Sequence, residues 1–396
     1  MRRWPFVSLV LIPVFLFALS CGGGGGENST PVERLAFYTS TTGVGDMSSW
    51  VEVSGSGLMG LDAADSICRA RADAAGLSGT FVAWLSDDSD DAYCRVHGLT
   101  GKKVDKCGQS TLPTSAGPWF RTDGKPFSAG IEDLTASGVI YNPVAADEFG
   151  STSELYNIYW TGTDDNGVAS NDNCSNWSDS TTGGLTIYMG ATYGTVTRYT
   201  EGVYISWCSY DNPLLCLETG TGNVIPAPAD TGQVVFITSV SGTGNLGSWS
   251  QAGGETGILA GDNICQEIAS TAGLSNAGSF KAWLSDSSTD AADRITSDGP
   301  WVRLDGVQVA GSKSALVNSW LQTSIAVTEE GDYRWYGVWT GTLEGGTRSA
   351  SACSDWTMGA GSTGESGDTS YNDSANWTAF LDLGCNNNYH LYCFED

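Results

Sequence analysis

The sequence is poor in positive charge. Its 396 residues include 18 Lys and Arg against 45 Asp and Glu, which gives a formal net charge of −27. Such a surface repels nucleic acids and anionic membranes, and it excludes both as general partners. Because only 16% of the residues are charged, most of the polar surface consists of hydroxyl and amide groups. These groups suit hydrogen bonding to neutral sugars, and they are equally typical of secreted proteins in general.

Motifs of metal sites and enzymes are also missing. The chain has two histidines and no Cys-x-x-Cys motif, so we expect no zinc site. His97 and His390 have no recurring Ser, Cys or acidic partner, and the Gly-x-Ser-x-Gly, phosphate-loop and dinucleotide motifs do not occur. A catalytic pair of carboxylates remains an alternative, since the sequence does not show which acidic side chains lie close together in the fold. We therefore expect a protein that is not an enzyme.

No hydrophobic run is long enough for a membrane span. The apolar run over residues 6–19 follows two arginines and is interrupted by Pro13. Its length and position indicate an export signal rather than an anchor. The run ends in Ala18-Leu19-Ser20-Cys21, which resembles a bacterial lipobox, with Ala18 where Leu is commonest. In a lipobox the cysteine is diacylated and becomes the mature N-terminus.

The lipobox resemblance sets the expected location of the protein. We expect a lipoprotein signal peptide over residues 1–21, lipidation of Cys21 and a flexible Gly-rich tether over residues 22–34. The protein would be held in a bacterial outer membrane by this lipid, facing outward or, alternatively, the periplasm. A plain signal peptide with a chance cysteine is the other interpretation.

The chain contains one pattern twice. Trp160-Thr161-Gly162-Thr163 is followed by three cysteines, and Trp339-Thr340-Gly341-Thr342 is followed by three more in the same order. The length suits two domains, and the 52 glycines favour turns and loops over long helices. We predict a loop-rich α+β protein with domains over residues 35–219 and 233–396. Residues 220–232 form the linker, a short semi-stiff spacer around Pro226-Ala227-Pro228-Ala229.

Hydrophobic spacing predicts the main elements of each domain. In the first domain a helix over residues 61–76 has Ala64, Ile67 and Cys68 on one face and Gly76 as its C-terminal cap. The second domain repeats this pattern around Cys265, with Gly273 at the end. Further predicted elements are strands 35–38, 81–85 and 280–284, Asp-Gly hairpins over 117–124 and 299–306, buried central strands over 156–161 and 333–340, and a short helix started by Asp87, Asp88, Asp90 and Asp91.

The eleven cysteines divide into three groups. Cys21 stands alone, six cysteines lie in the first domain and four in the second. Even numbers after a secretory leader indicate disulfides formed in an oxidising compartment. The sequence leaves fifteen pairings open in the first domain and three in the second.

Taken together, the repeated motifs resemble an endostatin-type domain, a branch of the C-type-lectin-like fold. Gly-Leu-x-x-Ala/Gly-Asp-x-x-Cys, Ala-Trp-Leu-Ser-Asp, Arg-x-Asp-Gly and Trp-Thr-Gly-Thr match the pattern of bacterial surface lipoproteins, including leptospiral-type repeat proteins of spirochaetes. The resemblance covers nearly the whole mature chain. It implies two tandem endostatin-like domains with nested disulfides: Cys68–Cys216 around Cys174–Cys208, and Cys265–Cys393 around Cys353–Cys385, leaving Cys94–Cys107 as a pair private to the first domain.

The resemblance implies less about function. The zinc-binding histidines and heparin-binding arginines of vertebrate endostatin have no counterpart here, and the Glu-Pro-Asn and Trp-Asn-Asp motifs of calcium lectins are absent. One loop is rich in calcium-type oxygen ligands, namely Asp164, Asp165 and Asp172 with neighbouring asparagines. Its spacing fits no EF-hand. It is either a calcium site or a solvated acidic loop.

Two further sets of residues are candidates for ligand binding. Arg95, Lys102, Lys103 and Lys106 form the one basic cluster of the sequence, on the loop between Cys94 and Cys107, and either dock an anionic glycan or acidic protein patch or carry routine surface charges. Trp177, Trp207, Trp356 and Trp377 lie in loop-rich parts where sugars would stack, although packing is the commoner role. Trp84, Trp160, Trp283 and Trp339 are expected in the cores.

These observations lead to a hypothesis about function. We expect a surface lipoprotein that binds an extracellular ligand, a glycan or a host or matrix protein, through lectin-like, adhesin-like domains without chemistry of its own. Two copies on one tether would gain avidity if both reach the ligand. The alternatives are a structural or accessory envelope protein and, more remotely, a hydrolase of envelope glycans.

Overall fold

The computed structural model describes residues 33–396 except 153–157, 171, 182–185, 188, 192–199 and 201–205. The predicted signal peptide, Cys21 and most of the predicted tether lie outside the described residues. The described chain combines helices and mostly short strands with five disulfides, which places it in the α+β class. None of its described helices has the length and apolar character needed to cross a bilayer.

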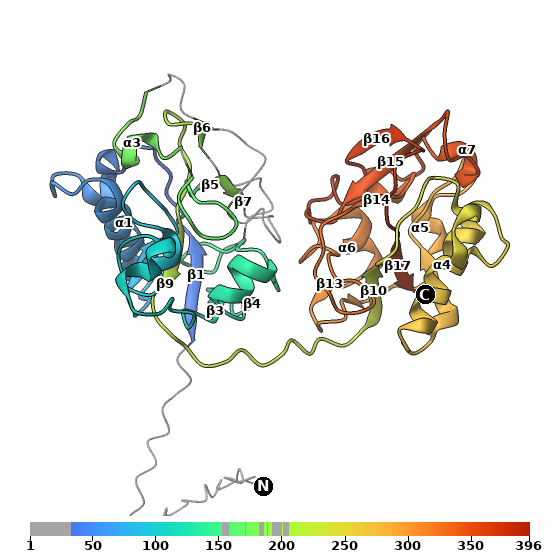
Figure 1. Ribbon diagram of the computed structural model, residues 1–396, viewed down its shortest axis with the longest axis horizontal. Coiled ribbons are helices and arrows are strands. Elements are labelled where there is room, and N and C mark those ends of the chain that lie inside the picture. The colour runs from blue at the N-terminus through green and yellow to red at the C-terminus, as the bar shows by residue number, and fades with distance from the viewer. Residues whose placement is uncertain are drawn as a thin grey trace, which may run out of the picture. The chain divides into compact units, whose positions relative to one another are not determined.

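Each repeat is built on a five-stranded sheet, and the two sheets have the same topology (Figure 1). The first has the order β2-β9-β1-β3-β4 and the second β11-β17-β10-β12-β13. In each, the first strand runs parallel to one neighbour and antiparallel to the last strand of the repeat. The strands are β1 (Arg34–Tyr38), β2 (Phe81–Ala83), β3 (Trp119–Arg121), β4 (Pro126–Ser128), β9 (Leu215–Glu218), β10 (Gln233–Ile237), β11 (Phe280–Ala282), β12 (Trp301–Val302), β13 (Gln308–Ala310) and β17 (Tyr392–Glu395).

One long helix packs on each sheet. Helix α1 (Gly60–Ala74) lies against β2, and α4 (Gly257–Thr271) lies against β11. The apolar stripe of α1 is buried, and Gly76 follows the helix at φ +71°, a left-handed conformation that suits glycine. The helices predicted from spacing are confirmed, as are the two Asp-Gly hairpins, β3–β4 and β12–β13.

The other helical segments are short. They are α2 (Ala92–Arg95), α3 (Cys174–Trp177), α5 (Ala291–Arg294), α6 (Lys313–Asn318), α7 (Cys353–Trp356), η1 (Met47–Ser49), η2 (Val51–Val53), η3 (Lys103–Gly108), η4 (Asp133–Ser137), η6 (Leu246–Ser248), η7 (Ser250–Ala252), η8 (Ala277–Ser279) and η9 (Glu344–Gly346). The short helix predicted to start at the acidic run is confirmed, since α2 begins directly after Asp91, but no Asp91 side-chain hydrogen bond caps it. Helix α2 has only four residues, and the Asp91 carboxylate accepts hydrogen bonds from the N–H groups of Lys103 and Ala169 instead.

A small antiparallel sheet in each repeat includes the strand that ends at the Trp of the Trp-Thr-Gly-Thr segment. The second repeat has the sheet β14-β15-β16, formed by Gly337–Trp339, Thr363–Asp368 and Leu381–Gly384. In the first repeat, β5 (Ile158–Trp160) pairs with β7 (Met189–Ala191), and β6 (Thr186–Ile187) with β8 (Ser206–Trp207). Strand β14 is buried as expected, but it is shorter than predicted and ends its sheet. Its outer edge bonds to the carbonyl of His390 rather than to a further strand.

The cores and disulfides agree with the sequence. Trp84, Trp160, Trp283 and Trp339 are buried, with at most 1% of each side chain exposed. All five disulfides link the pairs that the resemblance implies: Cys68–Cys216, Cys174–Cys208, Cys94–Cys107, Cys265–Cys393 and Cys353–Cys385. In both repeats the outer disulfide joins the long helix to the last strand of the sheet.

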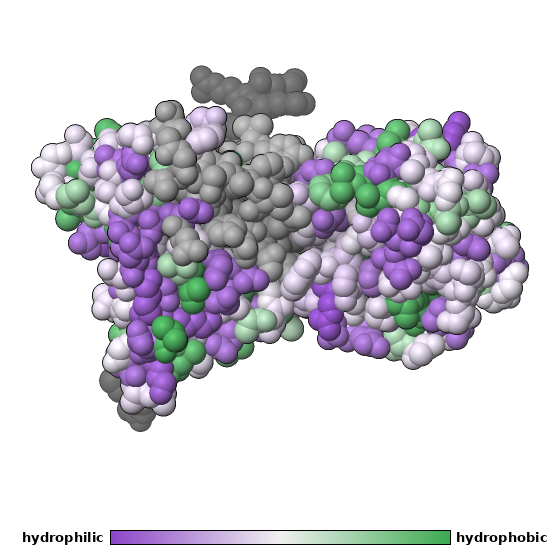
Figure 2. All heavy atoms as spheres, turned by 45° about the horizontal axis from the view of Figure 1, so that its top comes forward, coloured by the Kyte–Doolittle hydropathy of each residue, from purple (hydrophilic) through white to green (hydrophobic). Residues whose placement is uncertain are grey.

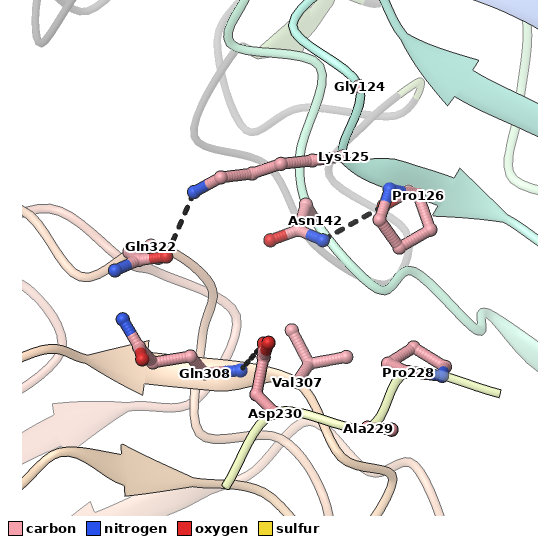
Figure 3. Close-up of a pocket in the computed structure, with 10 residues that line it drawn as sticks. All are labelled: Gly124, Lys125, Pro126, Asn142, Pro228, Ala229, Asp230, Val307, Gln308 and Gln322. Carbon is pink, nitrogen blue, oxygen red and sulfur yellow. Dashed lines mark hydrogen bonds between the residues drawn. The ribbon is translucent and has the colours of Figure 1, made fainter. Parts of the chain in front are cut away.

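The linker is fixed to its neighbours at both ends. At its start, Gly222 donates its N–H to the carbonyl of Gly117 in the first repeat. At its end, the Asp230 carboxylate accepts from the N–H of Gln308 at 3.0 Å, beside strand β13 of the second repeat (Figure 3). Both ends are therefore ordered against the repeat that they adjoin.

Candidate functional site

The Trp-Thr-Gly-Thr segment of the second repeat fixes the start of a loop. The Thr342 hydroxyl lies 2.8 Å from the hydroxyl of Ser285 and donates to the carbonyl of Thr340 at 2.7 Å. Gly341 has φ +57°, and a Cβ there would lie 2.7 Å from the Ser285 carbonyl oxygen and 2.7 Å from the Trp356 ring. Only glycine fits this approach. The motif thus has a structural role in holding the loop that follows it.

That loop ends in a turn of left-handed helix. The four residues Cys353–Trp356 have φ values of +47°, +52°, +55° and +62°, and Cys174–Trp177 in the first repeat are alike. This conformation costs L-residues roughly 1–2 kcal/mol each. The Cys353–Cys385 disulfide and the hydrogen bond from Trp356 Nε1 to the Ser285 carbonyl, 2.8 Å long, hold it in place. As a result Asp355 is presented beside Ser287, whose N–H and hydroxyl donate to its carboxylate at 2.8 and 2.9 Å.

A groove of about 470 Å³ lies beside this turn. We call it the Arg348 groove. The Arg348 backbone N–H and Nη1 both donate to Asp290 Oδ1, at 3.0 and 2.8 Å, and its side chain is 49% exposed. The described residues that line the groove include no aromatic side chain: they are Ser287, Arg348, Ser349, Ala350, Ala352, Ser354, Asp355 and Ser362. Its chemistry is that of hydroxyls, one carboxylate and one guanidinium.

Two carboxylates, on β15 and β16, accept hydrogen bonds from serines in or next to the groove. Glu365 on β15 and Asp382 on β16 are directly opposed across the two strands. The Ser349 hydroxyl donates to Glu365 at 3.2 Å, and the Ser351 hydroxyl donates to Asp382 at 2.8 Å. Burial raises the pKa of Glu365 and the charge of Asp382 raises it further, while hydrogen bonds from Ser349 and a backbone N–H act in the opposite direction. Ser349, which lines the groove, is thereby oriented by Glu365.

The first repeat has the same turn with different side chains. Ala169 stands at the position of Arg348, and Asn176 at that of Asp355. Asn173 and Asn176 donate their amide N–H groups to the Asp88 carboxylate, at 3.2 and 3.1 Å. The guanidinium is therefore a feature of the second repeat. Alignment of the two repeats would have exposed this difference, but no single motif would.

The structure does not assemble the predicted calcium site. Asp164 closes its own turn, accepting from the N–H groups of Asn166 and Val168 at 3.1 and 3.0 Å. Burial raises the pKa of Asp164. Within the described part of the chain, no three His, Cys, Asp or Glu side chains are grouped so as to hold a metal ion. Asp164, Asp165 and Asp172 therefore do not form such a group, and Asn171 of the same loop lies outside the described residues.

The predicted basic cluster is also dispersed. Arg95 is buried, with 6% exposed, and its guanidinium contacts Asp65 and donates to the carbonyls of Ala83 and Leu85. It belongs to the core, so its assignment to a docking surface is wrong. Sequence reasoning failed here because proximity to lysines along the chain does not show which way a side chain points.

The three lysines of the cluster are bound locally. Lys102 pairs with Asp91 at 3.2 Å, and Lys103 lies 4.1 Å above the Tyr93 ring. Lys106 donates to the carbonyl of Ser110 at 3.2 Å. These contacts hold the loop closed by Cys94–Cys107 against the rest of the first repeat. They also leave the three lysines less available to bind an anionic ligand than the sequence suggests.

Three of the four candidate tryptophans are buried. Trp177 and Trp356 are 0% exposed and Trp377 is 2% exposed, so none of them offers a ring face to a sugar. Trp177 and Trp356 instead lie against Trp160 and Trp339 in the cores. Trp207, at 40% exposed, is the one candidate that remains accessible.

Comparison with known proteins found no relative of this chain. No family model and no curated protein matches the chain. The geometry of the Arg348 groove and the sequence motifs are therefore the features that bear on function.

Proposed function

We propose that the chain is a non-catalytic binding protein that recognises a polar extracellular ligand through the Arg348 groove. The ligand is a glycan, free or carried by a host or matrix protein. The observation that carries the proposal is a groove of about 470 Å³ lined by hydroxyls, a carboxylate and a guanidinium. A sugar ring presents hydroxyls that both donate and accept, and this lining offers groups of both kinds.

The polar groups of the groove are already held in position. Asp355 is fixed by Ser287, and one nitrogen of Arg348 is fixed by Asp290. In the second repeat, which the structure describes in full, Nε and Nη2 of Arg348 have no other protein partner. Ordering side chains before binding reduces the entropy lost when the ligand arrives.

The surface favours polar over apolar recognition. On the face drawn in Figure 2, the hydrophobic residues of the described part lie in small patches among polar ones. Exposed apolar residues scattered in this way are normal for a soluble protein, whereas a large continuous patch marks a protein interface. Hydrogen bonding to a polar ligand is the better match to such a surface.

The fold of each repeat supports the same class of protein. A helix disulfide-bonded to the last strand, followed by an inner disulfide around a long loop, is consistent with an endostatin-like, C-type-lectin-like domain. We propose that the two repeats are tandem domains of this kind. Because only the second carries the arginine, we expect it to be the binding module and the first to hold it away from the tether.

The proposed cellular location of the protein depends on the lipobox-like motif. We propose that Cys21 carries lipid and that the protein is held in a bacterial outer membrane with its repeats outward. Palmitate labelling of the wild type and of Cys21→Ala tests the anchor, and protease treatment of intact cells tests the face. Equal labelling of the two proteins would rule out lipidation at Cys21.

Glycan and matrix-protein arrays test the binding function. The wild type should bind a restricted set of glycans, and Arg348→Ala should weaken this binding by about tenfold or more, as expected for loss of a charge-assisted hydrogen bond. Arg334→Ala is the matched control, because Arg334 is similarly exposed, at 46%, and paired with Asp332 outside the groove. Calcium should have no effect.

Two results would contradict the proposal. Binding that falls equally in Arg348→Ala and Arg334→Ala would indicate a general charge effect instead of a site. No binding on either array, together with loss of envelope integrity when the gene is deleted, would favour a structural envelope protein.

A further inference from the structure

The two repeats differ sharply at one position of the long helix. In the first repeat, Arg71 on α1 closes over Glu148, donating through Nε at 2.6 Å. Its Nη2 donates to the Ser40 hydroxyl at 2.6 Å, and its Nη1 lies 3.8 Å from Glu52. The Glu148 side chain is 0% exposed and that of Arg71 only 17%. A buried carboxylate thus has a guanidinium of the same chain as its partner.

The second repeat keeps the carboxylate and loses the cation. Glu329 accepts from the Ser239 N–H at 2.9 Å and from the Ser239 hydroxyl, just as Glu148 accepts from Ser40. It is 8% exposed. The helix position that holds Arg71, three residues after the helix cysteine, is occupied by Ile268. Glu329 therefore lies in the same setting without the guanidinium.

A cavity of about 280 Å³ lies beside Glu329 and Ile268. We call it the Glu329 pocket. Relative to the first repeat, two acids are gained around the pocket, since Glu267 replaces Ala70 and Glu330 replaces Phe149. One acid is lost, since Gln251 replaces Glu52, so the net change makes the pocket more acidic. Its lining residues are Ser239, Val240, Gln251, Glu267, Ile268, Thr271, Ala272, Glu329 and Glu330. The pocket thus combines three acids with the apolar side chains of Val240 and Ile268.

No cation of the second repeat neutralises these acids. The structure describes all six lysines and arginines of this repeat, and each one is bound elsewhere: Lys281 to Asp396, Arg294 to Asp262, Arg303 to Asp305, Lys313 to the Ile295 carbonyl, Arg334 to Asp332 and Arg348 to Asp290. A buried carboxylate without a cation is costly, and a cation brought from outside would offset that cost.

We propose that the Glu329 pocket binds a guanidinium group from outside the chain. The first repeat shows the contact in its intramolecular form, with a guanidinium against a glutamate and a serine hydroxyl. A guanidinium suits this pair better than an ammonium, because its planar fork donates to two acceptors at once. Val240 and Ile268 would cover the aliphatic stem. This site is distinct from the Arg348 groove, and neither depends on the other.

Titration of the full chain with short peptides tests the site. Gly-Arg-Gly should bind saturably, Gly-Lys-Gly more weakly, and the neutral citrulline analogue should not bind. Agmatine carries a guanidinium without a peptide backbone. Equal affinity for agmatine would assign the pocket to free guanidinium compounds, and tighter binding of the peptide would assign it to an arginine side chain of a partner protein. Both results support the proposal.

Two variants locate the binding. Glu329→Gln should weaken Gly-Arg-Gly binding about tenfold or more, whereas Asp293→Asn removes one exposed acid of the same repeat and should leave it unchanged. Because Glu329→Gln can also disturb the fold, Ile268→Arg provides an independent test. It recreates the first repeat's own ion pair, so it should abolish binding and raise the thermal midpoint.

Three outcomes would overturn the proposal. The first is no saturable binding of Gly-Arg-Gly to the wild type. The second is equal binding of the arginine and citrulline peptides. The third is an Ile268→Arg variant that is folded and binds like the wild type. Glycan binding through Arg348 is expected to persist in both Glu329→Gln and Ile268→Arg, which keeps the two sites separable.

Discussion

Arg95 pairs with Asp65 inside the first repeat, between helix α2 and helix α1. The same guanidinium donates to the carbonyl of Ala83 at 2.7 Å, so it joins both helices to the end of strand β2. The second repeat contains the same arrangement, in which both Nη2 contacts of Arg294 to Asp262 are 2.6 Å long. The pair is therefore a repeated structural element of the fold.

Replacing Arg95 should destabilise the first repeat strongly. Arg95→Met leaves the Asp65 carboxylate without its cation, and breaking a buried pair in this way costs about 3–5 kcal/mol. Urea unfolding of the full chain measures this loss. Adding Asp65→Asn should restore part of it, because no lone charge then remains. If the double variant is as unstable as the single one, the ion pair is not the cause.

The outer disulfide of the first repeat should contribute more stability than its private one. Cys68–Cys216 closes a separation of 148 residues and Cys94–Cys107 one of 13. On the chain-entropy view their contributions are about 5 and about 3 kcal/mol. Paired Cys→Ala variants, compared by denaturant midpoint, test the order. A larger loss on removing Cys94–Cys107 would show that local contacts of the loop outweigh chain entropy.

Features that depend on period or spacing could be predicted from the sequence. Helix α1 follows from its apolar stripe, and the hairpins follow from their Asp-Gly turns. The pairing of Cys68 with Cys216 required the resemblance, since the sequence itself left the pairings open. Burial of Trp160 follows from its place in an aromatic strand.

Features that depend on tertiary contacts could not be predicted. In the sequence Arg95 looks like a surface charge, and only the folded structure shows that it pairs with Asp65. The Arg348 groove depends on four successive left-handed residues, Cys353–Trp356, and no propensity predicts this conformation for Ser or Trp. The Glu329 pocket appears only when Arg71 and Ile268 are seen at equivalent positions of two folded helices.

Glu365 should make the stability of the second repeat depend on pH. Burial and then Asp382 raise its pKa in the folded state. A carboxyl with a raised folded pKa stabilises most below the unfolded value, about 4.3, and this contribution is lost as the pH rises through the folded pKa. Glu365→Gln should therefore raise the thermal midpoint at neutral pH and have little effect near pH 4.

The matched control for this prediction is Glu255→Gln, which removes one exposed carboxylate from the same repeat. Scanning calorimetry at several pH values compares the two variants with the wild type. An equal gain from Glu365→Gln at acidic and neutral pH would mean that packing, and not charge, produced the effect.

His97 should weaken the first repeat in acid. Its Nε2 accepts from the Ala116 N–H at 3.2 Å, so the proton lies on Nδ1, which donates to the Tyr93 carbonyl at 2.8 Å. Burial lowers the pKa of His97, although the bond to Tyr93 and the charge of Glu132 oppose the shift. For a base with a lowered folded pKa, the stability is present above the unfolded pKa, about 6.5, and is lost as the pH falls through the folded value.

Proton NMR can follow this titration directly, because the chain has only two histidines. Burial also lowers the pKa of His390, so both ring signals should titrate below the ordinary histidine value of about 6.5. His97→Gln removes one signal and should flatten the decline of first-repeat stability as the pH falls below about 6.5. The variant also identifies which signal belongs to His97. A His97 signal that titrates above the ordinary histidine pKa would contradict the buried, neutral ring and the hydrogen bond that Ala116 donates to it.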